Sequence, residues 1–161
     1  MAMPEISWTD VWSWSSGSAL LSAIITLAVG SYLLYMWQAR RSFQYEVVKF
    51  ISDEITSYAN DAVMYWASFS DGSQNRYIAR QKIRNGLPML FELINSTEVL
   101  DNVGKARIHE ALGGLFDAAT GGSFESSEKS QKEDADSRIE SILVASAVSR
   151  RILFLAAIKK N

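Results

Sequence analysis

The chain has 161 residues, a formal net charge of −2 at pH 7, one histidine and no cysteine. This length supports one small domain beside a membrane segment, and the lack of cysteine excludes disulfides, thiolate metal sites and a cysteine nucleophile. Because the chain has no cysteine, we do not expect redox chemistry. A charge this close to neutral provides no general attraction for nucleic acid, so we do not expect nucleic-acid binding either.

Residues 16–39 contain no Asp, Glu, Lys or Arg. The apolar run within them is about 20 residues, the length that a helix needs to cross the hydrocarbon of a bilayer. Apolar side chains cover the whole circumference of this helix, whereas a soluble core helix has a polar outer face. Aromatic residues suited to the headgroup level flank the run at Trp8, Trp12, Trp14, Tyr32, Tyr35 and Trp37. We therefore predict a transmembrane helix, with a buried core helix or an interfacial segment as the alternatives.

The charges around this segment predict its orientation. Residues 1–15 carry no Lys or Arg, which argues against a cleaved secretory signal. Arg40 and Arg41 directly follow the segment, and positive charge favours the cytoplasmic side. We expect a single-pass protein of a bacterial inner (cytoplasmic) membrane, with a short extracytoplasmic N-terminus at residues 1–15 and the C-terminal domain in the cytoplasm. The reverse orientation is the alternative.

Residues 40–120 are expected to form a cytoplasmic helical domain. Apolar residues recur at steps of three and four at Phe43, Val47, Phe50, Ile51, Ile55, Tyr58, Ala62, Tyr65, Trp66 and Phe69. This face favours packing inside the domain over a coiled-coil seam between chains, because it is wide and aromatic. No Pro or Gly separates this helix from the membrane segment, so the two form one helix from about residue 15 to 69 or bend near Ser42.

Turn residues predict the next boundaries. Residues 70–73 end the first pattern, and a second helix follows to about residue 85. The sequence Asn85-Gly86-Leu87-Pro88 indicates a stop and a new helix start. Asn95 and Glu98 have the spacing of a capping box, which predicts a boundary near Asn95. A further helix, weakened by the glycines at 104, 113 and 114, would bury Val99, Val103, Ile108, Leu112, Leu115, Phe116 and Ala119.

The last part of the chain divides in two. Residues 121–137 are rich in Gly, Ser and charge and predict a mobile loop, whose later part could begin the last helix. Residues 138–161 predict a C-terminal helix that packs on the bundle; a second membrane span is opposed by Arg150 and Arg151. The predicted fold class is all-α: a single N-terminal transmembrane helix followed by a small cytoplasmic helical bundle of about four helices.

Two patterns are candidate interaction sites. Small residues recur every fourth position in the membrane segment at Ser18, Ser22, Thr26 and Gly30, where another helix can approach closely; chance spacing is the alternative. Arg76, Arg80 and Arg84 line one helical face that suits lipid headgroups or an acidic partner. A solvated face paired with acids of the bundle is the simpler explanation of these arginines, and nucleic acid is the least favoured.

The sequence carries no catalytic or metal-binding motif that survives inspection. His109 begins an HExxH-like stretch, but Gly113 occupies the position of the second histidine. Gly104 and Lys105 match the end of a phosphate-binding loop, but Val99 occupies the position of its first glycine and Ala106 that of its Ser or Thr. Carboxylates such as Asp53, Glu54, Asp61, Glu92 and Glu110 have no diagnostic spacing. We expect no enzyme activity, no catalytic residue, no metal and no cofactor.

The remaining function class is interaction in the membrane. The first hypothesis is an anchored adaptor or regulator that self-associates or docks through its transmembrane helix, with the lipid bilayer and a protein partner or homo-oligomer as its partners. The second is a membrane-disrupting effector or toxin that oligomerises and permeabilises the inner membrane. The third is a subunit of a larger membrane complex, which would be unstable when expressed alone.

Overall fold

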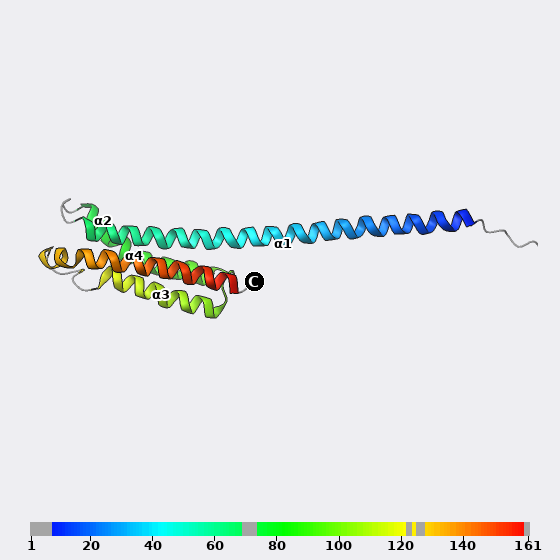
Figure 1. The fold of residues 1–161 in the computed structure, drawn as a ribbon. Helices are drawn as coiled ribbons and strands as arrows, with labels where there is room; N and C mark the ends of the chain where they lie inside the picture. The colour runs from blue at the N-terminus through cyan, green and yellow to red at the C-terminus, as the bar shows by residue number, and fades with distance from the viewer. Residues whose placement is uncertain (1–7, 69–73, 122–123, 125–127, 160–161) are drawn as a thin grey trace, which may run out of the picture. The chain divides into compact units, whose positions relative to one another are not determined.

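The computed structural model describes residues 8–68, 74–121, 124 and 128–159. These residues form four helices and no strand: α1 (Trp8–Ala67), α2 (Gln74–Ser96), α3 (Asn102–Thr120) and α4 (Glu128–Lys159) (Figure 1). The prediction of an all-α protein is confirmed. The chain divides into two compact units, Met1–Phe43 and Gln44–Asn161.

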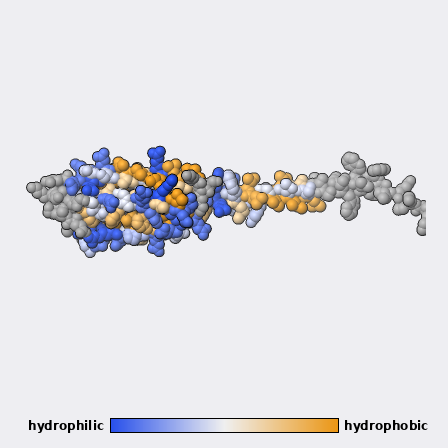
Figure 2. Space-filling view, turned by 90° about the horizontal axis from the view of Figure 1, so that it is seen from below, coloured by the Kyte–Doolittle hydropathy of each residue, from blue (hydrophilic) through white to orange (hydrophobic). Residues whose placement is uncertain are grey.

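The first unit contains the N-terminal part of α1. The helix begins at Trp8, well before the expected start of the membrane segment at residue 16, and residues 1–7 of the predicted N-terminus lie outside the described residues. From Leu21 to Phe43 the side chains are exposed, with Leu27 at 70 %. Figure 2 shows apolar surface along this stretch. A helix that is apolar all round requires an apolar environment, which this unit does not itself provide.

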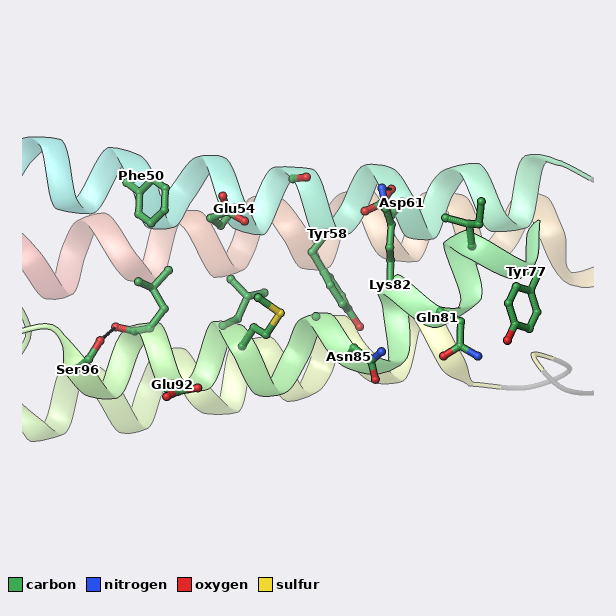
Figure 3. Close-up of a pocket in the computed structure, with 16 residues that line it drawn as sticks. Phe50, Glu54, Tyr58, Asp61, Tyr77, Gln81, Lys82, Asn85, Glu92 and Ser96 are labelled. Carbon is green, nitrogen blue, oxygen red and sulfur yellow. Dashed lines mark hydrogen bonds and ion pairs between the residues drawn. The ribbon is translucent and has the colours of Figure 1, made fainter. Parts of the chain in front are cut away.

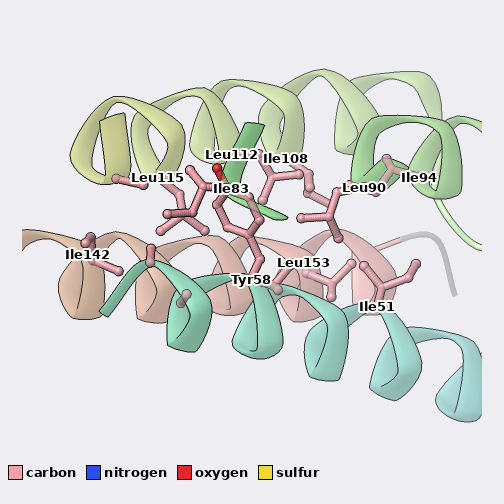
Figure 4. Packing of buried hydrophobic residues seen from close by; sticks show 14 of the residues in the cluster. Ile51, Tyr58, Ile83, Leu90, Ile94, Ile108, Leu112, Leu115, Ile142 and Leu153 are labelled. Carbon is pink, nitrogen blue, oxygen red and sulfur yellow. The ribbon is translucent and has the colours of Figure 1, made fainter. Parts of the chain in front are cut away.

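The second unit is built around one apolar core (Figure 4). Fully buried side chains recur at helical spacing, with Ile51 and Ile55 on α1 and Ile108, Leu112 and Leu115 on α3. The other two helices contribute further fully buried residues, among them Ile83, Ile94, Ile142 and Leu153. Burying each of these side chains contributes about 1.5–3 kcal/mol before the entropy cost of ordering is subtracted. The core therefore holds all four helices of this unit together.

Among the described residues of the predicted apolar face of α1, Phe43 and Phe50 are exposed and Val47 is half-buried, and Phe69 lies outside the described residues. Phe43 is exposed and belongs to the first unit, and Phe50 is 53 % exposed in the second. Ile51 and Ile55, by contrast, are fully buried. Successive residues of a helix are about 100° apart, so Phe50 falls at the edge of the face that Ile51 buries. The predicted apolar face was too wide at these two positions.

The expected stop at Gly86 is wrong, because α2 continues without interruption from Gln74 to Ser96 with Pro88 inside it. A β-carbon at Gly86 would lie 2.7 Å from Cδ2 of Tyr58, so glycine is needed here for close packing against α1 and not to end the helix. Pro88 cannot donate a hydrogen bond to the carbonyl of Arg84, and both residues are exposed to water. Tertiary packing thus overrides the local turn signal.

The cap between α2 and α3 also differs from the prediction. The helix boundary does lie close to Asn95, since α2 ends at Ser96, but Asn95 caps no helix. Asp101 is the N-cap of α3, and its Oδ1 accepts a hydrogen bond from the backbone N–H of Gly104 at 2.7 Å. The backbone carbonyl of Asn95 instead accepts a hydrogen bond from Nζ of Lys105 at 2.7 Å. The capping-box spacing of Asn95 and Glu98 therefore did not identify the N-cap residue.

The later part of residues 121–137 belongs to the last helix, which is the alternative that the sequence left open beside a loop. Helix α4 begins at Glu128, so residues 128–137 are helical. Residues 122–123 and 125–127 lie outside the described residues. Phe124 is buried, with its ring centroid 4.6 Å from that of Tyr65. The low-complexity composition concealed this one anchoring aromatic residue.

Candidate docking groove

A groove of about 1030 Å³ runs between α1 and α2 in the second unit (Figure 3). Exposed apolar side chains line it from both helices: Phe50 on α1, and Tyr77, Ile78 and Met89 on α2. Met89 is 69 % exposed, the same fraction as Ile158 on α4 and more than most aliphatic side chains of this unit. The groove therefore exposes apolar surface that folding of this chain leaves uncovered.

Tyr58 lies on the wall of the groove and is only 5 % exposed. Its ring packs against Gly86, and its hydroxyl forms no hydrogen bond with any residue that the structure describes. Burial raises the pKa of this hydroxyl well above its usual value, so the group stays protonated and keeps its hydrogen-bonding capacity. A buried hydroxyl of this kind requires a partner from water or a bound molecule.

The charged residues of the groove are mainly acidic. Asp61 and Lys82 form an ion pair across α1 and α2, with 2.9 Å between Oδ1 and Nζ. Glu54 and Glu92 also line the groove, and neither forms an ion pair or hydrogen bond with the described residues. Once the Asp61–Lys82 pair is set aside, two carboxylates remain beside the apolar lining. The groove is thus apolar along its length and negative at its sides.

The predicted small-residue stripe lies on the first unit. Thr26 donates a hydrogen bond from Oγ1 to the carbonyl of Ser22 at 2.8 Å, within the same helix. Gly30 has nothing within 4 Å of the position of an added β-carbon. Ser18 lies in α1, but its side chain is outside the described part of the structure. The stripe is therefore open along Gly30, and it does not take part in the core of this chain.

The predicted basic stripe does not form one free surface. The guanidinium of Arg76 lies 5.0 Å from the ring centroid of Tyr65, and that of Arg80 lies 5.8 Å from the ring centroid of Phe124. Arg84 is exposed, and all three arginines take part in interactions within the chain. Cations held over aromatic rings stabilise the local packing. Two of the three arginines therefore lie against aromatic rings of the bundle, and both explanations of the stripe stay predictions.

The groove could not be predicted from the sequence, because its two sides come from different helices, α1 and α2. Phe50 was assigned to the buried face of its helix, and Tyr77, Ile78 and Met89 were assigned no role. The only available signal was the excess of apolar residues on α2 beyond those that one buried face requires.

His109, the residue of the rejected zinc motif, packs beside Phe91 with ring centroids 4.7 Å apart. The described residues contain no group of three His, Asp or Glu side chains that could hold a metal.

No family model, no curated protein and no solved structure matches this chain. Two segments of the described helices are long and apolar enough to cross a membrane, Leu21–Ala67 and Asp134–Ile158. No residue of the apolar window in the first is buried in the structure, against 22 % of the window in the second. The length and apolar composition of these two segments agree with membrane association.

Proposed function

We propose that this chain is a single-pass membrane-anchored interaction protein that recruits a partner through the groove between α1 and α2. The N-terminal part of α1 serves as the anchor in an inner membrane, and the bundle lies in the cytoplasm. The observation that carries the proposal is the groove itself, where exposed apolar residues are combined with the carboxylates of Glu54 and Glu92. An adaptor, a regulator and a subunit of a membrane complex all use such a surface.

The groove suits an amphipathic helix of a partner protein with Lys or Arg at its edges. Its lining on α2 extends from Tyr77 to Ser96, which corresponds to about 28 Å of helix at 1.5 Å per residue. Helices bound in grooves place apolar anchors at steps of three and four into such a surface. Basic residues beside those anchors would pair with Glu54 and Glu92. Acidic partner helices would be repelled.

The test is affinity purification of the full-length chain in mild detergent, with mass spectrometry of the bound proteins and native mass of the complex. Met89→Lys places a cation among the apolar contacts and is expected to weaken partner binding about 30-fold, the effect of losing a central contact of about 2 kcal/mol. Val103→Lys is the matched control, because Val103 is 60 % exposed, close to the 69 % of Met89, but lies on α3 and does not line the groove.

The expected partner is bound at fixed stoichiometry, contains a basic amphipathic helix, and is displaced by a synthetic peptide of that helix. Met89→Lys loses it and Val103→Lys retains it. A partner that both variants bind equally, or one that the peptide does not displace, contradicts the proposed groove.

Self-association through the membrane helix is tested separately with Gly30→Leu. In the described part of the chain, no atom outside the neighbouring residues and the helix's own backbone lies within 4 Å of a β-carbon added at Gly30, so folding of the monomer is expected to be unchanged. We expect dimerisation in bilayers to weaken by about 1 kcal/mol, roughly fivefold, measured by energy transfer between labelled copies. Ala28→Leu adds a side chain about 200° away around the helix and is the control.

Equal dimerisation of the Gly30→Leu and Ala28→Leu variants would contradict an interface at this stripe. Leakage of dye from the same vesicles that requires Gly30 would instead favour the permeabilising alternative.

A further inference from the structure

Helix α4 has two opposite sides with the spacing of helix–helix contact. The inner side is buried in the core at alternating steps of four and three: Ile142, Ser146, Ser149 and Leu153. Exposed residues follow the same alternating steps along the outer side: Glu140, Val144, Ala147, Arg151, Phe154 and Ile158. Residues nine positions apart, such as 142 and 151, are about 180° apart around a helix. These six exposed residues, the outer seam, thus have the spacing by which two helices pack together.

The outer seam is apolar at four of its six positions. Val144 is 57 % exposed and Ile158 is 69 % exposed. Further exposed apolar side chains border the seam: Leu143, Val148 and Leu155. Ala147 is small and lets a facing helix approach closely, since the distance between packed helices depends on the side chains at the contact. Contiguous apolar surface of this kind is typical of a protein–protein contact.

The other two positions of the outer seam carry opposite charges, Glu140 and Arg151. Both side chains are exposed, and neither forms an ion pair or hydrogen bond with the residues that the structure describes. Asp136, one turn before Glu140, is exposed on the same side and adds a second carboxylate. The first half of this side is therefore negative, and its second half carries the positive charge. Such a surface is complementary to a reversed copy of itself.

An antiparallel second copy of α4 matches the apolar positions and the charges in one register. Residues 140 and 151 have the same midpoint as residues 144 and 147, between 145 and 146. When Glu140 faces Arg151 of the second copy, Val144 therefore faces Ala147 of that copy. A twofold axis at the midpoint repeats both contacts, so two ion pairs enclose an apolar centre. A parallel pairing in register would instead place like charges against each other at both positions.

The antiparallel register also sets the direction from which the second copy comes. Nη1 of Arg150 lies 3.4 Å from Oγ1 of Thr56 on α1. Figure 4 shows Ile51 and Leu153 toward one end of the core, so α1 and α4 run antiparallel in the bundle. The C-terminal end of α4 therefore lies at the end where Gln44 begins the second unit. In the pair, the two anchors join at opposite ends, which suits a copy from a facing membrane and not a neighbour of the same orientation.

We infer that the outer seam of α4 binds the outer seam of a second, antiparallel copy of this chain. The pairing does not depend on the groove, whose lining contains no residue of α4. It is also separate from association at Gly30, which lies in the first unit. A helix of another protein is the competing occupant, and self-association of the purified chain separates the two.

Charge reversal tests the register. The full-length chain is studied in mild detergent, with Gly30→Leu in every variant so that the stripe of the first unit does not contribute. Glu140→Arg and Arg151→Glu each turn two attractive contacts of the dimer into repulsive ones. Each is expected to raise the dimer dissociation constant about tenfold in sedimentation equilibrium. The chain with both reversals regains opposite charges and is expected to return to within about twofold of the parent.

Two exposed charges on α3 provide matched controls. Glu110→Arg and Arg107→Glu make the same changes of charge away from α4 and are expected to leave the dissociation constant unchanged. Equal weakening by the control and the seam variants would reflect net charge alone and would overturn the inference.

Two single-cysteine chains test the orientation, because the natural chain has no cysteine. Residues 137 and 154 share the same midpoint and are both exposed. Antiparallel pairing therefore brings Ser137→Cys of one chain opposite Phe154→Cys of the other. After the two chains are mixed and oxidised, disulfides between residues 137 and 154 are expected to exceed those between like residues.

Three results would overturn the inference. They are a parent chain that stays monomeric at micromolar concentration, single reversals that leave the dissociation constant unchanged, and disulfides that join mainly like residues. The first two leave the face without a second copy, and the third excludes the antiparallel orientation. Partner binding at the groove is measured separately with Met89→Lys, so failure of one proposal is distinguishable from failure of the other.

Discussion

Replacing Trp66 with alanine is expected to lower the free energy of unfolding of the bundle by about 3–5 kcal/mol, the cost of removing a large aromatic side chain from a packed core. Trp66 is fully buried, and its ring meets that of Tyr65 edge-on at a centroid distance of 5.5 Å. Its indole N–H donates a hydrogen bond to the carbonyl of Ala119 at 2.9 Å. One side chain thus links the end of α1 to the end of α3.

The hydrogen bond is expected to account for a separate part of this loss. Trp66→Phe keeps most of the apolar volume but leaves the carbonyl of Ala119 without its donor, at a cost of about 1–3 kcal/mol. The neighbouring bond from the Tyr65 hydroxyl to the carbonyl of Phe124, at 2.6 Å, stays in place. The three chains should therefore rank as wild type, Trp66→Phe and Trp66→Ala in order of falling stability.

The measurement is urea unfolding of the full chain in mild detergent, followed by far-ultraviolet circular dichroism with the micelle-bound helix as a constant baseline. Met64→Ala is the control, because Met64 is exposed two residues away on the same helix and should change stability by less than about 0.5 kcal/mol. Equal effects at residues 64 and 66 would show that the packing at the ends of α1 and α3 contributes little to stability.

The helical segments of the bundle could be predicted from the sequence because apolar periodicity reports directly on burial. Ile51, Ile55, Ile108 and Leu112 are predicted on buried faces and are fully buried. The prediction is wrong for Val103, which was expected on the inward face of the same helix as Ile108 and is 60 % exposed near the start of α3. Each such prediction requires only that one side of a helix avoid water, which local spacing expresses.

Helix boundaries and the docking groove could not be predicted in this way. The continuity of α2 through Gly86 depends on the ring of Tyr58, which is distant in sequence, and the burial of Phe124 depends on Tyr65. The groove depends on which apolar residues are left over after α1 and α2 have packed. Such information lies in pairs of segments, and no local pattern contains it.

Introducing a charge at the centre of the proposed anchor tests the membrane assignment most directly. Leu27→Arg is expected to disfavour insertion of this helix by about 3–4 kcal/mol, since arginine at the centre of a spanning helix costs about 2.5–3.5 kcal/mol and the favourable contribution of leucine is lost. This corresponds to a change of more than about a hundredfold in the insertion equilibrium. Most of the variant should leave the membrane fraction after alkaline extraction.

Tyr45→Arg is the matched control for this substitution. Tyr45 and Leu27 are exposed to similar extents on the same helix, but Tyr45 lies beyond Arg40 and Arg41, in the second unit. In water, arginine is tolerated at either position, because neither side chain packs against the core. The membrane fractions of the two variants are therefore expected to differ only if residue 27 lies in hydrocarbon. If both variants stay in the membrane fraction, the first unit does not insert as a helix; if neither does, binding depends on a surface that includes Tyr45. Loss of Leu27→Arg alone assigns the uncovered apolar surface of the first unit to lipid.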